Sequence, residues 1–256
     1  MKKCNRKFRA NSSGQLLIVA ALMIAIIISS TTIYVYELSK ETNSRDSCSI
    51  SGVALGLKQA TKNAMISSLA NVSKGGDNAV LEGNLNDLSQ VFRNLHQPGM
   101  CHLSFTVFND SRYDSGVYLS WGTNGSGVSS TYANFTLKIQ NLAANLAVDY
   151  AVNMTTTIAI NGAYTKLEGE EKLVNLTCRV FNEEEPTLAK NITLFYENLG
   201  SWIPINSSNN LSTVDYGNGT YLLSFTVSTS SDVQVSAHVY DLRDIFVQAN
   251  TTCTEA

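Results

Sequence analysis

The residues of this sequence that most clearly allow a chemical modification are asparagines followed two positions later by serine or threonine. This N-x-[ST] pattern is the acceptor for N-linked sugars. After the apolar N-terminal segment it begins at eleven positions: Asn71, Asn109, Asn124, Asn134, Asn153, Asn175, Asn191, Asn206, Asn210, Asn218 and Asn250. A single match arises easily by chance, and the alternative is that these are ordinary turn and strand residues. The number of matches predicts a glycoprotein.

Four of these asparagines lie in segments whose side chains alternate between apolar and polar, as in a strand with one buried face. In "YANFTLKIQ", Ala133, Phe135 and Leu137 share one face and Asn134 lies on the other. The same test places three further sequons on polar faces: Asn153, Asn175 and Asn191. These positions suit glycosylation, which needs an exposed attachment point, although asparagine favours polar faces in any case.

Cysteine is the second residue type that could form a covalent bond here. Cys4 precedes the apolar segment, and Cys48, Cys101, Cys178 and Cys253 follow it. Four cysteines allow three pairings, of which chain order favours Cys48–Cys101 and Cys178–Cys253. Because Cys178 and Cys253 both fall on inward faces of alternating segments, we expect a bridge between them, worth roughly 3–4 kcal/mol.

The sequence contains no recognisable motif for catalysis, for a cofactor or for a metal. The sequence has no C-x-x-C, and His96, His102 and His238 lack ligand spacing. The glycine-rich stretch 122–127 has neither a following helix nor the lysine of a phosphate-binding loop, which favours a β-turn. No G-x-S-x-G is present. We therefore expect no enzyme activity, no cofactor and no metal site.

The apolar segment at 16–36 carries no charge and is long enough, as a helix, to span a bilayer. Its Ser and Thr hydroxyls can bond to the preceding turn of the helix. Five basic residues and no acidic one precede it, which favours an N-terminus inside the cell. The sequence thus predicts a cytoplasmic leader at 1–15, a transmembrane helix at 16–36 and a linker at 37–52.

The basic leader, Gly14-Gln15 and the apolar helix together resemble the class III leader of archaeal type IV pilin-like proteins. In that family a peptidase cuts just before the apolar helix, which implies cleavage after Gly14. The family often carries Glu five residues into the mature helix, where this chain has Val19. A retained anchor is the expectation, and pilin-type cleavage or removal of a signal peptide are the alternatives.

The part of the chain after the apolar segment holds every acidic residue, the first being Glu37. An acidic domain lacks the basic stripe that nucleic-acid binding requires, so we expect no nucleic-acid partner. This part is long enough for two small domains. Residues 53–154 read as two helices, the second capped by Asp77 or Asn78, followed by strands, which predicts an α+β domain.

Residues 155–256 show short alternating segments separated by turns, which predicts an all-β sandwich. Within them "DYGNGTY" resembles the strand entry of filamin-type and bacterial Ig-like domains. That resemblance implies tight-turn glycines at Gly217 and Gly219 after Asp215, and a corner tyrosine at Tyr221. The expected fold class is an N-terminal transmembrane helix, an α+β domain and a C-terminal Ig-like sandwich.

Together these features predict a single-pass membrane protein whose C-terminal part lies outside the cell. Its expected role is structural or adhesive, with the lipid bilayer and other envelope proteins or glycans as partners. Two alternatives stay open: a pilin-like subunit that polymerises through its N-terminal helix, and a surface sensor or accessory subunit that binds a solute or a membrane protein. The sequence leaves the oligomeric state open.

Overall fold

The computed structural model describes residues 24, 28–33, 52–95, 101–140 and 145–256. The chain divides into two compact units, Met1–Leu55 and Gly56–Ala256.

The first unit is helical at its described residues 24 and 28–33. The Thr31 and Thr32 hydroxyls both donate to the Ile28 carbonyl oxygen, at 2.9 and 2.7 Å, as expected for hydroxyls in an apolar helix. Within the described ranges, no helix combines the length and the apolar character that a membrane crossing needs. The predicted single-pass anchor and its localisation are therefore not supported and are corrected here. Most of 16–36 and 37–52, and all of 1–15, lie outside the described residues.

Two helices precede the strands. The first covers 52–72 and lies in the second unit from Gly56 onward, and the other is α2 (Ala79–Leu95). Their apolar residues recur at helical spacing and are buried, with Met65, Leu69, Leu81 and Leu85 fully enclosed. The predicted cap of α2 is confirmed, because the Asp77 carboxylate accepts a hydrogen bond from the Ala79 N–H at 2.9 Å.

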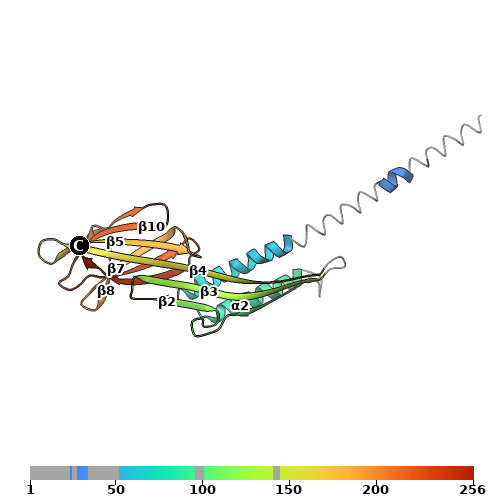
Figure 1. Ribbon diagram of the computed structural model, residues 1–256, viewed down its shortest axis with the longest axis horizontal. Helices are drawn as coiled ribbons and strands as arrows, with labels where there is room; N and C mark the ends of the chain where they lie inside the picture. The colour runs from blue at the N-terminus through green and yellow to red at the C-terminus, as the bar shows by residue number, and fades with distance from the viewer. Residues whose placement is uncertain (1–23, 25–27, 34–51, 96–100, 141–144) are drawn as a thin grey trace, which may run out of the picture. The chain divides into compact units, whose positions relative to one another are not determined.

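The larger of two sheets has nine strands (Figure 1). Its main path runs in the order β1 (Cys101–Val107), β3 (Ser126–Gln140), β4 (Asn145–Lys166), β5 (Glu171–Asn182), β10 (Thr220–Ser228) and β9 (Ser212–Asp215). Three short strands attach to it: β2 (Val117–Trp121) beside β3, β6 (Glu185–Pro186) beside β5 and β13 (Thr254–Glu255) beside β4. All these pairings are antiparallel except that of β13 with β4.

The smaller sheet has four antiparallel strands in the order β12 (Phe246–Thr252), β11 (Gln234–Asp241), β7 (Ala189–Asn198) and β8 (Ser201–Pro204). A short 3-10 helix, η1 (Ser207–Asn209), leads from this sheet back to the larger one. Side chains from both sheets form a single apolar cluster, in which Cys178, Phe225, Val235 and Val247 are completely buried. This face-to-face arrangement is compatible with a β-sandwich.

One face of the larger sheet is covered along its length by two different layers, and we call it the inner face. The helices cover the part that contains Phe135 and Val152, while the smaller sheet covers the part that contains Ile160. Ser89 of α2 donates to the Leu103 carbonyl oxygen at 2.7 Å, which joins the helical layer to β1. Figure 1 shows β3 and β4 continuing from the helical part into the part that faces the smaller sheet.

The expected fold class is wrong. Strands account for 53% of the described residues, and the structure is mostly β, with two antiparallel sheets in place of a membrane helix, an α+β domain and a separate Ig-like sandwich. The physical reason lies in β4, whose inward positions continue from Met154 through Thr156 to Ile158 across the expected boundary at 154/155. An inward threonine interrupts the apolar pattern there, although the strand itself does not stop. Gly56–Ala256 accordingly forms one compact unit.

Candidate functional site

The face of the larger sheet opposite the inner one, here called the outer face, carries three of the strand sequons. Asn134, Asn153 and Asn175 lie on β3, β4 and β5 and are all exposed. Asn134 stands opposite Ala151, and Asn153 stands opposite Tyr132, so these two asparagines flank the Tyr132 side chain. Period-two alternation predicted this placement, because each asparagine sits between two buried neighbours.

The other sequons are distributed over the rest of the second unit. Asn191 lies on β7 and is exposed, as the alternation predicted, and Asn250 of β12 is half-buried. The remaining six lie at a helix end, in turns or beside η1, and all are exposed: Asn71, Asn109, Asn124, Asn206, Asn210 and Asn218. The structure therefore leaves ten of the eleven side chains exposed at the surface.

The amide groups of these asparagines are oriented in two ways. In six sequons the Oδ1 atom accepts a hydrogen bond: Asn134, Asn153, Asn175, Asn206, Asn218 and Asn250. In the described structure none of these six Nδ2 atoms donates one. In Asn191 and Asn210, by contrast, Nδ2 donates to a threonine hydroxyl, at 3.4 and 3.3 Å. Since a sugar is attached through Nδ2, the first orientation keeps the acceptor nitrogen available.

An aromatic cluster lies on the outer face next to Asn153. It consists of Phe108, Tyr113, Tyr118 and Tyr132, whose ring centroids are 5.0 Å apart for Phe108–Tyr132 and 5.7 Å apart for Tyr113–Tyr118. The Arg112 guanidinium lies over the Tyr118 ring, 5.2 Å from its centroid. Hydrogen bonds to the Tyr118 hydroxyl, first from Ser120 and then from Arg112, lower its pKa. Sequence analysis did not find this cluster, because the loop after β1 is what brings Phe108 and Tyr113 onto the sheet.

Two shallow depressions are also present at the surface. One, of about 230 Å³, lies over β4 and β5 and is lined by Ala159, Ile160, Asn161, Thr177 and Arg179. The other, of about 520 Å³, lies beside the helix over 52–72 and is lined by Asn63, Ile66, Ser67, Ala70, Asn71, Lys74, Arg243 and Asp244. Both open to solvent and are lined by polar and apolar atoms alike, so neither encloses a small molecule as an enzyme pocket does.

The cysteines do not form the predicted bridge. Cys178 and Cys253 belong to the same buried cluster, but both are free thiols, as is Cys101. Burial raises the pKa of Cys178 to about 12 and that of Cys253 to about 11. Both cysteines occupy inward positions of alternating segments, so the sequence correctly placed their side chains in the core. The alternation does not determine how far apart the two sulfur atoms lie. Cys4 and Cys48 lie outside the described residues, and the predicted pairing of Cys48 with Cys101 therefore lies outside them as well.

The turn that precedes β10 has the geometry that the predicted corner residues require. Gly217 and Gly219 adopt φ values of 72° and 78°, and Asp215 accepts a hydrogen bond from the Gly217 N–H at 2.7 Å. A Cβ at Gly219 would lie 2.5 Å from the Thr187 carbonyl oxygen. The buried Tyr221 hydroxyl accepts a hydrogen bond from the Ala189 N–H at 2.8 Å, which ties β10 to the start of β7.

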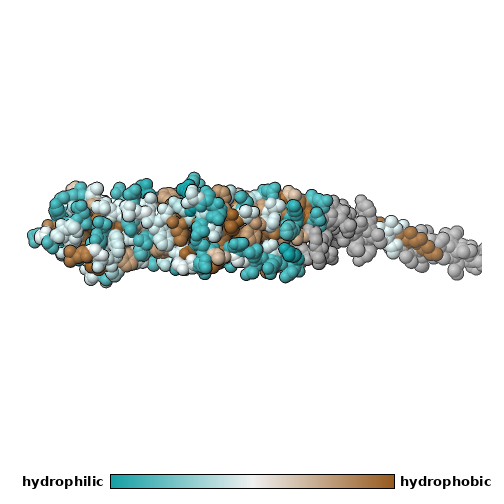
Figure 2. All heavy atoms as spheres, turned by 90° about the horizontal axis from the view of Figure 1, so that it is seen from below, coloured by the Kyte–Doolittle hydropathy of each residue, from teal (hydrophilic) through white to brown (hydrophobic). Residues whose placement is uncertain are grey.

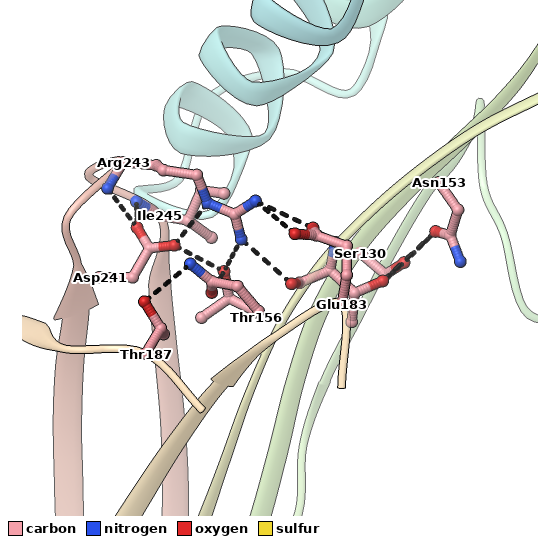
Figure 3. A network of polar contacts seen from close by, with 10 residues as sticks. Ser130, Asn153, Thr156, Glu183, Thr187, Asp241, Arg243 and Ile245 are labelled. Atoms are coloured by element: carbon pink, nitrogen blue, oxygen red, sulfur yellow. Dashed lines mark hydrogen bonds and ion pairs between the residues drawn. The ribbon is translucent and has the colours of Figure 1, made fainter. Parts of the chain in front are cut away.

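A polar network centred on Asp241, absent from the sequence predictions, joins the larger sheet to the smaller one (Figure 3). Asp241 is fully buried, and its carboxylate accepts hydrogen bonds from the Arg243 and Ile245 N–H groups, both at 2.9 Å. The Arg243 guanidinium bonds to Asp241 at 2.8 Å and to both Glu183 carboxylate oxygens, at 2.9 and 3.0 Å. Thr156 donates to Asp241 at 2.9 Å and accepts from Arg243 at 3.0 Å.

This network is structural, because its charged groups satisfy one another. The four residues come from β4, from the β5–β6 turn, from the end of β11 and from the turn after it, so their spacing in the sequence carries no signal. The one local cue is "DLRD", in which Asp241 bonds to the backbone two and four residues on, as aspartates in turns do.

The glycine-rich stretch 122–127 connects β2 to β3 and packs against β12. A Cβ at Gly127 would lie 2.0 Å from the Gln248 carbonyl oxygen, so no other residue fits there without displacing the strand. The Gly125 N–H donates to the Asn250 carbonyl oxygen at 2.8 Å. These contacts give the stretch a packing role, and residues 123–125 form a bend between β2 and β3.

His238 belongs to the smaller sheet. It lies half-buried on β11, with its ring centroid 4.6 Å from that of Phe195 and 5.4 Å from that of Phe246. Burial lowers the pKa of its imidazole. Across the described ranges, no group of three or more His, Cys, Asp or Glu side chains is arranged to hold a metal ion.

Comparison with known proteins adds no relative. No protein-family model matches this chain, and a search of curated proteins found no match.

Proposed function

We propose that this chain has a structural or adhesive role in the cell envelope, in which the outer face of the larger sheet contacts other envelope proteins or glycans. The observation that carries this proposal is the outer face itself. Along β4, its side chains are exposed or half-buried from end to end, while those of the inner face from Val152 to Tyr164 are buried. A strand of this length spans roughly 70 Å, which gives a long and rigid surface for contact.

The composition of the outer face supports a contact role. The depression over β4 and β5 is lined by two polar residues, two apolar residues and one cation, which are Asn161, Thr177, Ala159, Ile160 and Arg179. Figure 2 shows another view of the molecule, in which hydrophobic residues of the second unit are interspersed with hydrophilic ones in several separate patches. Interfaces that bind weakly or reversibly have this mixed character.

In-cell photo-cross-linking tests the proposal. A photoreactive residue at Asn161 or Thr177, on the outer face, is expected to yield adducts with another envelope component. The matched control is Leu199, which is 97% exposed but lies in the β7–β8 turn. Adducts from the outer face and not from the control support the proposal. If the outer-face positions give no adduct, or the control gives the same one, the outer face is not the contact surface.

A second candidate is the pilin-like subunit, and a specific observation favours it. In the helical part of the first unit, Ile24, Ile28 and Ile33 are 58%, 59% and 60% exposed. Helices of neighbouring subunits would cover these side chains in a filament. The resemblance of the leader to that of pilin-like proteins supports the same role.

Electron microscopy and mass spectrometry test this candidate. Filaments whose subunits begin at Gln15 are expected, and Ile28→Asp should abolish them because a charge would enter the helical contact. Leu199→Asp is the control, since Leu199 lies in an exposed turn of the second unit. Monomers with an uncut leader would contradict this candidate without affecting the first.

A further inference from the structure

The aromatic cluster on the outer face lacks a cover among the described residues. Phe108 is 39% exposed, and Tyr113, Tyr118 and Tyr132 are half-buried, with Tyr113 in ring contact with each of the other three. Aromatic rings packed edge to face on an open sheet leave their upper surface to water, which is unfavourable for Phe108 in particular. The cluster therefore favours an additional layer in the mature protein.

Asn153 is placed to supply that layer. It stands directly opposite Tyr132 in the β3–β4 register, where facing side chains are about 5 Å apart. Its Oδ1 atom accepts hydrogen bonds from Ser130 at 3.1 Å and from Thr155 at 3.3 Å. The Ser130 hydroxyl is also 3.1 Å from the Tyr113 hydroxyl, which links the amide to the cluster.

The two hydrogen bonds to Oδ1 fix the direction of the amide nitrogen. Figure 3 shows the oxygen of Asn153 turned toward Ser130 and the nitrogen turned away from it. Nδ2 is the atom that carries an N-linked sugar, and attachment there leaves both bonds to Oδ1 in place. The sequon hydroxyl of Thr155 lies on the same face, two residues further along β4.

We propose that Asn153 is N-glycosylated and that its first sugar rings lie over Tyr132 and cover the aromatic cluster. Sugars present C–H faces that pack on aromatic rings and hydroxyls that bond to neighbours such as Arg112. In the transfer step Nδ2 displaces a phosphate group from C1 of a lipid-linked sugar. The N–C1 bond forms, the C1–O bond breaks with its electron pair leaving on the phosphate, and Nδ2 loses a proton.

The folded sequon is held too firmly to enter a transferase site. The Thr155 N–H donates to the Glu183 carboxylate at 2.9 Å, and its carbonyl oxygen accepts from the Glu183 N–H at 3.1 Å. Transfer must therefore precede the pairing of β4 with its neighbours. This inference rests on the proposed envelope role, because the chain must reach the compartment in which sugars are transferred.

Peptide mapping of the chain purified from its native host is the first test. The Asn153 peptide is expected to carry a sugar mass. Asn153→Gln and Thr155→Ala should remove that mass, and Thr155→Ser should keep it. Asn161→Gln is the matched control: Asn161 is exposed on the same face of the same strand but is followed by Gly and Ala, so it is not a sequon.

Tyrosine nitration tests whether the sugar covers the cluster. Nitration of Tyr132 should rise several-fold in Asn153→Gln over the native glycosylated chain, while Tyr216, 59% exposed and remote from the cluster in the sequence, serves as internal reference. Equal nitration of Tyr132 in both chains would refute the cover. An unmodified Asn153 beside a modified Asn206 would refute the site and leave the envelope role intact. Absence of sugar at every sequon would refute the site as well, and the cross-linking experiment would then decide the envelope role separately.

Discussion

Two buried threonines on neighbouring strands provide a matched pair of substitutions for testing the polar network. Thr156 of β4 and Thr131 of β3 are both fully buried and both lie on the inner face. Thr156 bonds to Asp241 and Arg243, whereas the Thr131 hydroxyl has no hydrogen-bond partner within the described residues. Replacement by valine keeps the shape and the strand preference of threonine and removes only the hydroxyl.

Thr156→Val is expected to lower the free energy of unfolding by about 2–3 kcal/mol, because hydrogen bonds to charged groups contribute about 1.5–3 kcal/mol and an Asp241 oxygen loses a donor. Thr131→Val should have the opposite sign and raise stability by about 1 kcal/mol, since an unpaired hydroxyl is replaced by a buried methyl group. Urea denaturation of the full chain, followed by circular dichroism, measures both values.

The difference between the two variants is the informative quantity. Both change the same residue type to the same residue type in the same sheet, so effects on strand propensity and on the unfolded state cancel. If the two variants are equally stable, the hydrogen bonds around Asp241 contribute nothing net, and the network cannot be what joins the layers. A double variant that combines Thr156→Val with Arg243→Ala should show less than additive loss, because the two side chains share a bond.

Three further predictions concern single groups. The Cys178 and Cys253 thiols should resist maleimide at mildly alkaline pH in the native chain and react on unfolding, because burial raises the pKa of both; a mass that shows them already oxidised would contradict the free thiols. Burial lowers the pKa of His238, so the neutral imidazole contributes its full stability above the unfolded pKa of about 6.5, and this stability is lost as the pH falls through the lower, folded pKa. His238→Gln should therefore flatten the dependence of the unfolding free energy on pH between about pH 7 and about pH 5. An unchanged slope would argue against a lowered pKa at His238. Tyr221→Phe should cost about 1 kcal/mol in urea denaturation, because it leaves the Ala189 N–H without its acceptor; an unchanged midpoint would mean that water replaces the hydroxyl.

The local features of the fold could be predicted from the sequence because they depend on neighbouring residues. Alternation placed Asn134 on the outer face and Phe135 on the inner face, and the aspartate before α2 marked its cap. The glycines of the turn before β10 fell where positive φ is needed. Each of these depends on a few adjacent positions, so a single sequence contains the whole signal.

The features that the sequence did not show depend on which segments meet. Both cysteines point inward, as their positions in the alternating segments predicted. Cys253 packs over Gly162 of β4, and a Cβ atom at position 162 would lie 2.5 Å from the Cys253 sulfur. The sequence around Cys253 gives no sign that it packs against β4, and the sequence around Cys178 on β5 gives no sign of which segment covers it. The aromatic cluster has the same origin, since a loop of ordinary composition folds back to bring Tyr113 beside Tyr132.

The boundary error at 154/155 has a physical explanation that also accounts for the buried polar residues. A continuous sheet covered first by helices and then by a second sheet needs a joint between the two covers, and backbone groups at that joint are without regular partners. Phe246, the first residue of β12, lies there: its N–H donates to the Ser73 hydroxyl at 3.0 Å, and its carbonyl oxygen accepts from Ser129 at 2.7 Å. The Asp241 carboxylate meets the same need for the Arg243 and Ile245 N–H groups, and Thr156 donates a hydrogen bond to it. Thr156, which lies just after the expected boundary at 154/155, therefore helps to join β4 of the larger sheet to the end of β11 in the smaller sheet.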